Sequence, residues 1–106
     1  MTTLNTVEEL KERLSQNNPS DVLLDVRTAG EFSSGHIKGA INLTVGSEEF
    51  FNKIESLDKS KTYITFCLSG NRSGMAAMMM AQKGLEVINS KVGFMHWKNA
   101  GATVSV

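Results

Sequence analysis

Cys67 is the residue whose surroundings in this sequence best suit nucleophilic chemistry. Thiolates rather than thiols are nucleophiles, and the pKa of a cysteine falls beside a cation or at the start of a helix. Arg72 follows on the same segment and is always charged, while Gly70 permits a positive φ angle that lets a loop curl its amides toward an anion. The other polar side chains of the segment are Ser69, Asn71 and Ser73. These groups predict an anionic sulfur held among hydrogen-bond donors, with one cation nearby.

A lone cysteine also has a more ordinary interpretation, as a small buried apolar side chain. Cys67 is the only cysteine, so it can form neither a disulfide within the chain nor a multi-cysteine metal site. His36 and His96 have no metal-ligand spacing with any carboxylate, and we predict no metal site. A polar loop with glycine and arginine, placed between a strand and a helix, is a poor context for inert packing. We therefore favour the reactive interpretation of Cys67.

A strand before Cys67 and a helix after it must position this loop. Residues 62–66 are β-branched and aromatic, which predicts a strand that runs directly into the cysteine. Residues 73–83 are helix-forming, and Gly84 suits the position just after a helix end. The helix contains four methionines, which we interpret as packing residues rather than as a cofactor site: Met75, Met78, Met79 and Met80.

The other segments alternate between helix and strand. Capping-box patterns at Thr6–Glu9 and Thr28–Glu31 mark two helix starts. The predicted helices are 7–16, 28–32, 48–57 and 95–99, and the other predicted strands are 22–26, 40–43 and 86–90. The apolar stripe of the third helix is Phe50, Phe51, Ile54 and Leu57. The alternation predicts an α/β fold, a parallel sheet with helices on both faces, and it places the Cys67 loop at the strand ends where such folds bind ligands.

Composition excludes several classes of protein. With 41% hydrophobic and 21% charged residues, the 106-residue chain has the balance of one small globular domain. Lys+Arg and Asp+Glu are both 11, so the formal net charge is zero, which argues against nucleic-acid and membrane-surface partners. No run approaches the roughly 18 apolar residues of a membrane span. The start of the chain resembles no signal peptide and the lone thiol suits a reducing compartment, so we expect a cytoplasmic protein.

Three separate motifs resemble the signatures of rhodanese domains, in the same order. Residues 24–27, 31–32 and 35–42 resemble the N-terminal signature, with the sequences LDVR, EF and GHIKGAIN. Residues 67–73, CLSGNRS, look like the active-site loop, and residues 92–101 resemble the C-terminal signature. The resemblance covers nearly the whole chain. It implies a three-layer α/β/α architecture around a five-stranded parallel sheet, with residues 1–106 as a single rhodanese domain.

The resemblance also implies a reaction, sulfur transfer through a persulfide on the catalytic Cys67. The donor would be thiosulfate or a persulfide, and the acceptor cyanide, a small thiol or a protein thiol, with no metal or organic cofactor. The substrate-binding residues would be Leu68, Ser69, Gly70, Asn71, Arg72 and Ser73. Some family members that favour thiosulfate carry basic residues where this chain has Leu68 and Ser69. The neutral pair therefore predicts weak use of thiosulfate and better use of an organic persulfide.

Asp25 and Arg27 lie at the end of a predicted buried strand, where two roles are open. They could organise the floor of the pocket as supporting residues. The more ordinary interpretation is an ion pair that holds the strand end, for which we expect Arg27 to pair with Glu31. His36 is interpreted as structural rather than as a general base, and Trp97 as a residue of the core or its rim.

Two other functions use the same features. Related folds place a cysteine loop around phosphate or arsenate, with histidine before the cysteine and five residues between it and the arginine. Here Phe66 precedes Cys67 and only the four residues 68–71 separate it from Arg72, a shorter loop that fits a sulfur atom better. A non-catalytic binding module is the second alternative, but such modules typically lose the cysteine. Alkylation of Cys67 separates the enzyme from the binding module, since an enzyme has a reactive thiol and a module an inert one.

Overall fold

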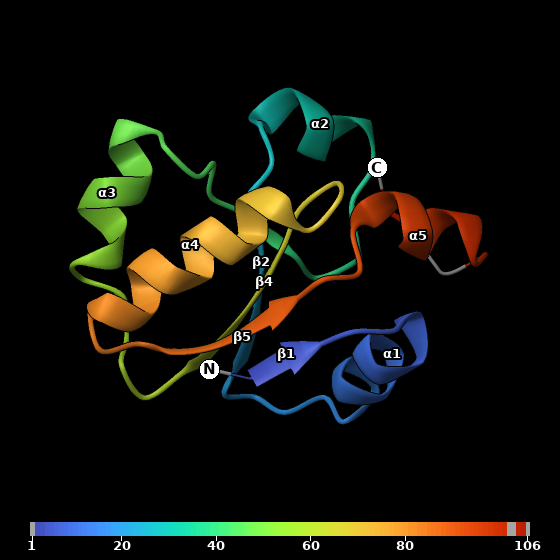
Figure 1. Ribbon diagram of the computed structural model, residues 1–106, viewed down its shortest axis with the longest axis horizontal. Helices are drawn as coiled ribbons and strands as arrows, with labels where there is room; N and C mark the ends of the chain where they lie inside the picture. The colour runs from blue at the N-terminus through green and yellow to red at the C-terminus, as the bar shows by residue number, and fades with distance from the viewer. Residues whose placement is uncertain (1, 102–103, 106) are drawn as a thin grey trace.

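A single sheet of five parallel strands forms the centre of the molecule (Figure 1). The computed structural model describes residues 2–101 and 104–105. The strand order is β1-β5-β4-β2-β3, and every neighbouring pair is parallel. The strands are β1 (Thr2–Leu4), β2 (Asp21–Asp25), β3 (Ile41–Asn42), β4 (Thr62–Phe66) and β5 (Glu86–Ser90). Since all strands run the same way, their carboxyl ends meet at one edge of the sheet.

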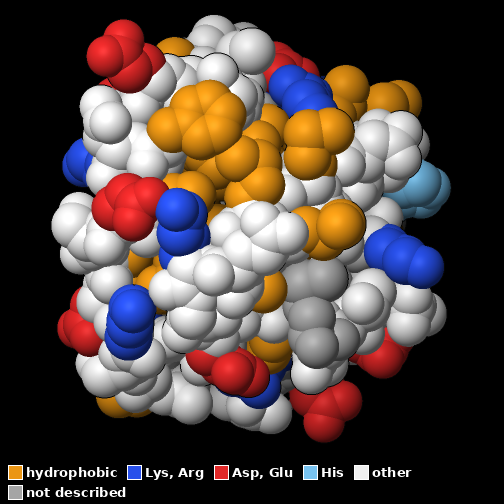
Figure 2. Space-filling view, turned by 60° about the vertical axis from the view of Figure 1, so that its left-hand side comes forward, with side chains coloured by type: hydrophobic (Ala, Val, Ile, Leu, Met, Phe, Trp, Pro, Cys, Tyr) orange, Lys and Arg blue, Asp and Glu red, His pale blue; other side chains and the backbone are white. Residues whose placement is uncertain are grey.

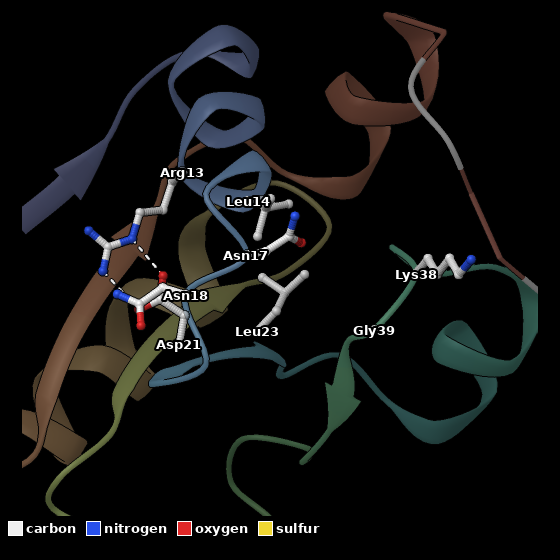
Figure 3. Close-up of a pocket in the computed structure, with 8 residues that line it drawn as sticks. All are labelled: Arg13, Leu14, Asn17, Asn18, Asp21, Leu23, Lys38 and Gly39. Atoms are coloured by element: carbon white, nitrogen blue, oxygen red, sulfur yellow. Dashed lines mark hydrogen bonds and ion pairs between the residues drawn. The ribbon is translucent and has the colours of Figure 1, made fainter.

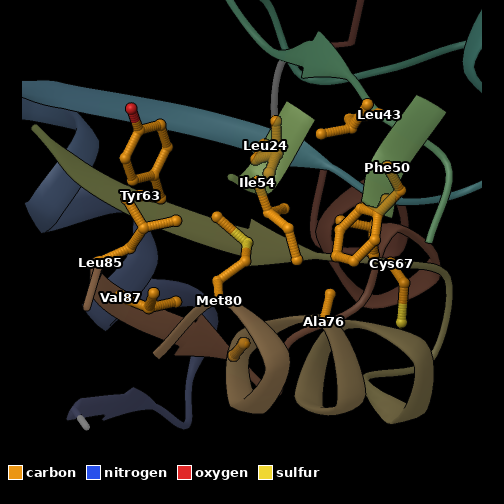
Figure 4. Close-up of a cluster of buried hydrophobic side chains, with 12 residues drawn as sticks. Leu24, Leu43, Phe50, Ile54, Tyr63, Cys67, Ala76, Met80, Leu85 and Val87 are labelled. Carbon is orange, nitrogen blue, oxygen red and sulfur yellow. The ribbon is translucent and has the colours of Figure 1, made fainter. Parts of the chain in front are cut away.

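Helices cover both faces of the sheet, which confirms the predicted α/β/α layers. The helices are α1 (Val7–Ser15), α2 (Ala29–Ser34), α3 (Glu48–Ile54), α4 (Asn71–Gln82) and α5 (Phe94–Asn99). One buried cluster joins α3 and α4 to the sheet through Phe50 and Met80, and Figure 4 shows Cys67 within it. The second cluster joins α1 and α5 to the other side through Leu10 and Trp97. Cys67 thus lies between the central strand β4 and the α3–α4 layer.

Side-chain caps fix where α1 and α2 begin. The second predicted capping box is complete, because the Thr28 hydroxyl accepts from the Glu31 amide and the Glu31 carboxylate accepts from the Thr28 amide. The first is only half formed. Thr6 caps the amide of Glu9, whereas the Glu9 carboxylate accepts from the amide of Asn5. Both caps satisfy amides that have no partner inside the helix.

Several predicted details differ in the structure. Strand β1 was not predicted, and helix α4 begins at Asn71, two residues before the expected start. Helix α3 ends at Ile54 rather than at residue 57. The expected apolar stripe is also broken, because Phe51 is 47% exposed. Within the described residues, no helix is both long and apolar enough to cross a membrane.

The methionines of α4 divide between core and surface. Met80 is fully buried and Met79 packs against the core, as expected of packing residues. Met75 and Met78 are 62% and 60% exposed, so packing does not explain them. Figure 2 shows hydrophobic side chains gathered on the face of the molecule that carries α3 and α4.

Candidate active site

Cys67 follows the last residue of β4, at the carboxyl edge of the sheet, and its side chain is fully buried. The chain then turns through Gly70, which has a φ of +97°, and enters α4 at Asn71. A left-handed φ of this kind strongly favours glycine, because other residues meet steric strain there. The predicted strand, curled loop and helix are therefore all present around the sulfur.

The Cys67 sulfur takes the place of a side-chain cap at the start of α4. Gly70 occupies the N-cap position and has no side chain with which to accept a hydrogen bond. Sγ accepts instead from the amides of Gly70, at 3.0 Å, and Ser73, at 3.4 Å, and the Ser73 hydroxyl oxygen lies 3.6 Å away. An acceptor that receives amide donors at a helix start is stabilised most when it carries negative charge.

These contacts govern the ionisation of the thiol. Burial raises the pKa of Cys67, but hydrogen bonding with the Ser73 side chain and with the amides of Ser73, Ser69 and Gly70 more than offsets this effect. The net effect is a lowered pKa. A buried cysteine with a raised pKa would be inert, whereas this one is poised toward the thiolate.

The loop is fastened to the connection between β5 and α5. The amide of Phe94 donates to the Cys67 carbonyl at 2.8 Å. A Cβ atom on Gly93 would lie 2.0 Å from the Leu68 carbonyl oxygen, and one on Gly70 would lie 2.9 Å from the carbonyl oxygen of Lys91. Only glycine at these positions lets the two backbones approach this closely.

Asp25 and Arg27 form a buried ion pair behind the loop. Arg27 Nη2 lies 2.7 Å from one carboxylate oxygen of Asp25, and its Nε reaches both oxygens at 3.0 and 3.1 Å. The guanidinium also donates to the carbonyl of Gly35 at 2.7 Å and lies over the Phe94 ring. The expected pairing of Arg27 with Glu31 is wrong, because Asp25 lies closer along the same strand end. This ion pair joins β2, the loop after α2, and α5.

Arg72 forms an ion pair with a residue of α2. Its Nη1 and Nη2 donate to the two carboxylate oxygens of Glu31 at 2.7 and 3.0 Å. Hydrogen bonding to Arg72 lowers the pKa of Glu31 to about 2. In turn, hydrogen bonding to Glu31 raises the pKa of Arg72, with a further contribution from Coulomb attraction to Cys67. Arg72, the expected cation, is therefore attracted electrostatically to the Cys67 thiolate, but its guanidinium is already paired with Glu31.

The other expected loop residues differ in their contacts. Ser73 is buried and contacts the sulfur, while Leu68 is partly buried in the second core cluster. In the described part of the chain, the side chains of Ser69 and Asn71 make no hydrogen bond to the sulfur, so the predicted ring of donors consists mainly of backbone amides. Among the described residues, no group of three or more His, Cys, Asp or Glu side chains could hold a metal ion.

Comparison with known families agrees with the fold and the cysteine loop described above. The family model of the rhodanese-like domain matches residues 6–100. The chain belongs to the rhodanese-like family. It is 33% identical over 89 residues to the protein YtwF of Bacillus subtilis, with 84% of each chain covered.

Two other relatives extend this comparison, one by sequence and one by structure. The rhodanese-like chain is 30% identical over 106 residues to the thiosulfate:glutathione sulfurtransferase of Saccharomyces cerevisiae, with 89% of this chain and 76% of that protein covered. A rhodanese-related protein from Thermoplasma volcanium superposes with a TM-score of 0.84 at 28% identity, covering 99% and 98% of the two chains. These relatives support a sulfurtransferase role for the family to which the chain belongs.

Sequence reasoning did not predict that Glu31 pairs with Arg72 at the site. The capping-box pattern already gave its carboxylate a partner, and 41 residues separate it from Arg72. The Glu31 carboxylate takes part in the capping box and also pairs with Arg72, since one of its oxygens accepts from the Thr28 amide as well as from Arg72. His36 is structural as expected, because its ring stacks on Phe32 at 3.8 Å and its Nδ1 lies 2.9 Å from the Phe32 carbonyl.

Two hollows of this rhodanese-like domain lie at opposite edges of the sheet. One, of about 410 Å³, is lined by Leu68 of the loop, Glu31 of α2, and Phe94, Met95 and Lys98 of α5. The other, of about 290 Å³, lies where β2 begins, beside the ion pair of Arg13 and Asp21 (Figure 3). The first adjoins the Cys67 loop, and the second is at the far end of the parallel strands.

Proposed function

We propose that this protein is a sulfurtransferase that carries a sulfane sulfur on Cys67 as a persulfide. The observation that supports this most strongly is the buried Cys67 sulfur, which accepts hydrogen bonds from the amides of Gly70 and Ser73. The thiol also has a lowered pKa. Buried amide donors stabilise a charged sulfur without needing to reorganise during the reaction. The same donors suit both resting forms of such an enzyme, since a thiolate and a persulfide anion each carry one negative charge.

The reaction divides into two displacements at sulfur. With thiosulfate, the Cys67 thiolate attacks the outer sulfur, the sulfur–sulfur bond of the donor breaks, and sulfite leaves with the electron pair. An acceptor such as cyanide or a thiolate then attacks the outer persulfide sulfur and restores the Cys67 thiolate. Charge balances in each step, and neither a metal nor an organic cofactor takes part. The name of the yeast relative, which pairs thiosulfate with glutathione, supports a thiol as acceptor.

The residues around the sulfur have separable roles in this proposal. The amides of Ser69, Gly70 and Ser73 and the hydroxyl of Ser73 hold the charged sulfur. The Asp25–Arg27 pair supports the loop from behind by fixing the end of β2 against α5.

The hollow lined by Leu68, Phe94 and Met95 would receive the organic part of a donor or acceptor, because these side chains are apolar and adjoin the loop. Asn71 and Arg72, in the first turn of α4, complete the proposed substrate-binding residues of the segment that follows Cys67. We place the reaction in the cytoplasm, whose reducing conditions keep a lone thiol free.

Replacing the nucleophile tests this function. The substitution Cys67→Ser should abolish sulfur transfer and leave the melting temperature close to that of the wild type, because serine is nearly the same size. Mass spectrometry of the wild type after incubation with thiosulfate or an organic persulfide should show the mass of one added sulfur. Transfer activity in a folded Cys67→Ser protein would exclude the persulfide mechanism.

A further inference from the structure

We propose that Glu31 determines the choice of sulfur donor, by holding the Arg72 guanidinium and so disfavouring donors that release an inorganic dianion. Glu31 belongs to α2 and is not part of the cysteine loop. This inference rests on the proposed sulfurtransferase function and adds the class of donor that the site favours, an organic persulfide.

The geometry of the ion pair leaves Arg72 little to offer an anion. Both terminal nitrogens of its guanidinium face the two carboxylate oxygens of Glu31, a bidentate contact that uses the planar fork of arginine. The pair is partly shielded, with side-chain exposures of 38% for Arg72 and 29% for Glu31. Thiosulfate would have to displace a carboxylate that is covalently attached to the protein and already in place.

Titration does not release this contact under ordinary conditions. The hydrogen bonds from Arg72 are the main reason why the pKa of Glu31 lies at about 2, so the carboxylate stays charged at every pH where the protein would work. The amide and hydroxyl of Thr28 also donate to it and fix its position at the start of α2. Glu31 is therefore a permanent competitor for Arg72.

The nearby cations do not replace Arg72. Arg27, at the floor of the adjoining hollow, is paired with Asp25 and bonded to the Gly35 carbonyl. Lys98 lies at the same hollow but is exposed to solvent, where its attraction for an anion is weak. Thiosulfate transfer places two charges on the departing sulfite, and among the described residues that line this hollow no buried cation is free to meet them.

An organic persulfide does not require a free cation for its leaving group. The Cys67 thiolate attacks its outer sulfur, the sulfur–sulfur bond breaks, and a thiolate leaves with the electron pair and takes up a proton from water. The leaving group carries at most one charge, and its carbon skeleton can contact Leu68 and Phe94 in the hollow. The site as built therefore favours this class of donor over thiosulfate.

The test compares two donors on the wild type and two variants of Glu31. The donors are thiosulfate and the persulfide of 2-mercaptoethanol, whose organic part is uncharged. Glu31→Gln removes the charge but keeps an oxygen for the cap, while Glu31→Asp keeps the charge and shortens the reach to Arg72. We expect both variants to raise the ratio of kcat/KM for thiosulfate to kcat/KM for the persulfide about five- to tenfold, mainly through a lower KM for thiosulfate.

A control and the possible outcomes separate the explanations. Glu86→Gln removes the same charge at the start of β5, on the opposite edge of the sheet, and should leave the donor ratio unchanged. A gain in Glu31→Gln alone, with Glu31→Asp equal to the wild type, would overturn the proposal in favour of a simple charge effect. Unchanged ratios in both variants would also overturn it. If the wild type formed no persulfide with either donor, the proposed function itself would fail.

Discussion

Cys67 combines complete burial with a lowered thiol pKa, although burial alone has the opposite effect. The amides of Gly70 and Ser73 resolve this opposition, because they point at the sulfur from a helix start that has no other cap. The thiolate is thus stabilised by neutral donors fixed in the backbone, and it does not depend on an adjacent free cation.

Ser73 offers a direct test of this arrangement. Ser73→Ala removes the hydroxyl but keeps the amide, so we expect the pKa of Cys67 to rise and thiolate alkylation to shift to higher pH. The rate of reaction with iodoacetamide as a function of pH measures this change. Ser69→Ala is the matched control, because the exposed Ser69 side chain makes no contact with the sulfur. Equal shifts in the two variants would show that the hydroxyl of Ser73 is unimportant.

Sequence reasoning identified the cysteine and its loop but not the partners of the charged residues. Gly70, Cys67 and the helix start follow from local chemistry, which a sequence displays directly. The pairing of Arg72 with Glu31 depends on how α2 packs beside α4, and such distances across the fold are not encoded in local spacing. The same holds for Arg27, which pairs within its own strand end instead of with Glu31.

At the scale of elements, the cysteine loop depends on the connection between β5 and α5. Gly93 passes against the carbonyl of Leu68, and the Phe94 amide donates to Cys67 itself. The loop is therefore shaped from two sides, by α4 ahead of it and by this connection beside it. That is a physical reason for glycine within the C-terminal motif.

Substituting Gly93 tests the dependence on this connection. Gly93→Ala would bring its Cβ to 2.0 Å from the Leu68 carbonyl oxygen, so one backbone must move. We expect a loss of about 1–3 kcal/mol in the free energy of unfolding, by analogy with overpacked cores, and a larger loss of sulfur transfer. Chemical denaturation and a transfer assay measure the two effects. Gly30→Ala, where no atom lies within 4 Å of the new Cβ, should be neutral or stabilising.

The elements were predicted well where their patterns were strong. Four of the five strands carried β-branched or apolar runs, and the alternation with helices gave the parallel sheet. Strand β1 was missed because Thr2–Leu4 has only three residues and lies at the edge of the sheet, where a two-residue alternation cannot be recognised. Its place depends on pairing with β5, which is a property of the whole fold.

At the scale of the whole molecule, the parallel sheet places the residues of the candidate site at one edge. The ends of β2, β4 and β5 bring together Asp25, Cys67 and the connection to α5, and α2 adds Glu31. The ion pair of Glu31 and Arg72 at this edge joins segments 41 residues apart in the sequence. The protonation of Glu31 therefore affects the stability of the entire protein, through linkage.

Acid unfolding should reveal the ion pair of Glu31 and Arg72. The pKa of Glu31 is about 2 in the folded protein, against an ordinary value of 4.5. A lowered pKa contributes stability that is fully present above about pH 4.5 and is lost as the pH falls through about 2. We expect the free energy of unfolding, measured by urea titration, to fall less over this range in Glu31→Gln. Arg72→Gln should flatten the profile similarly, and a steep wild-type profile in both variants would contradict this assignment.

The sulfur that caps α4 should also make the proposed catalytic cycle visible to spectroscopy. The Gly70 and Ser73 amides donate to the Cys67 sulfur, which in the proposed cycle alternates between a thiolate and the inner sulfur of a persulfide. Their proton and nitrogen resonances should therefore move when the outer sulfur is loaded and return when it is discharged. In protein labelled with the heavy nitrogen isotope, two backbone signals of the 106-residue chain would then follow turnover directly, with no coupled assay.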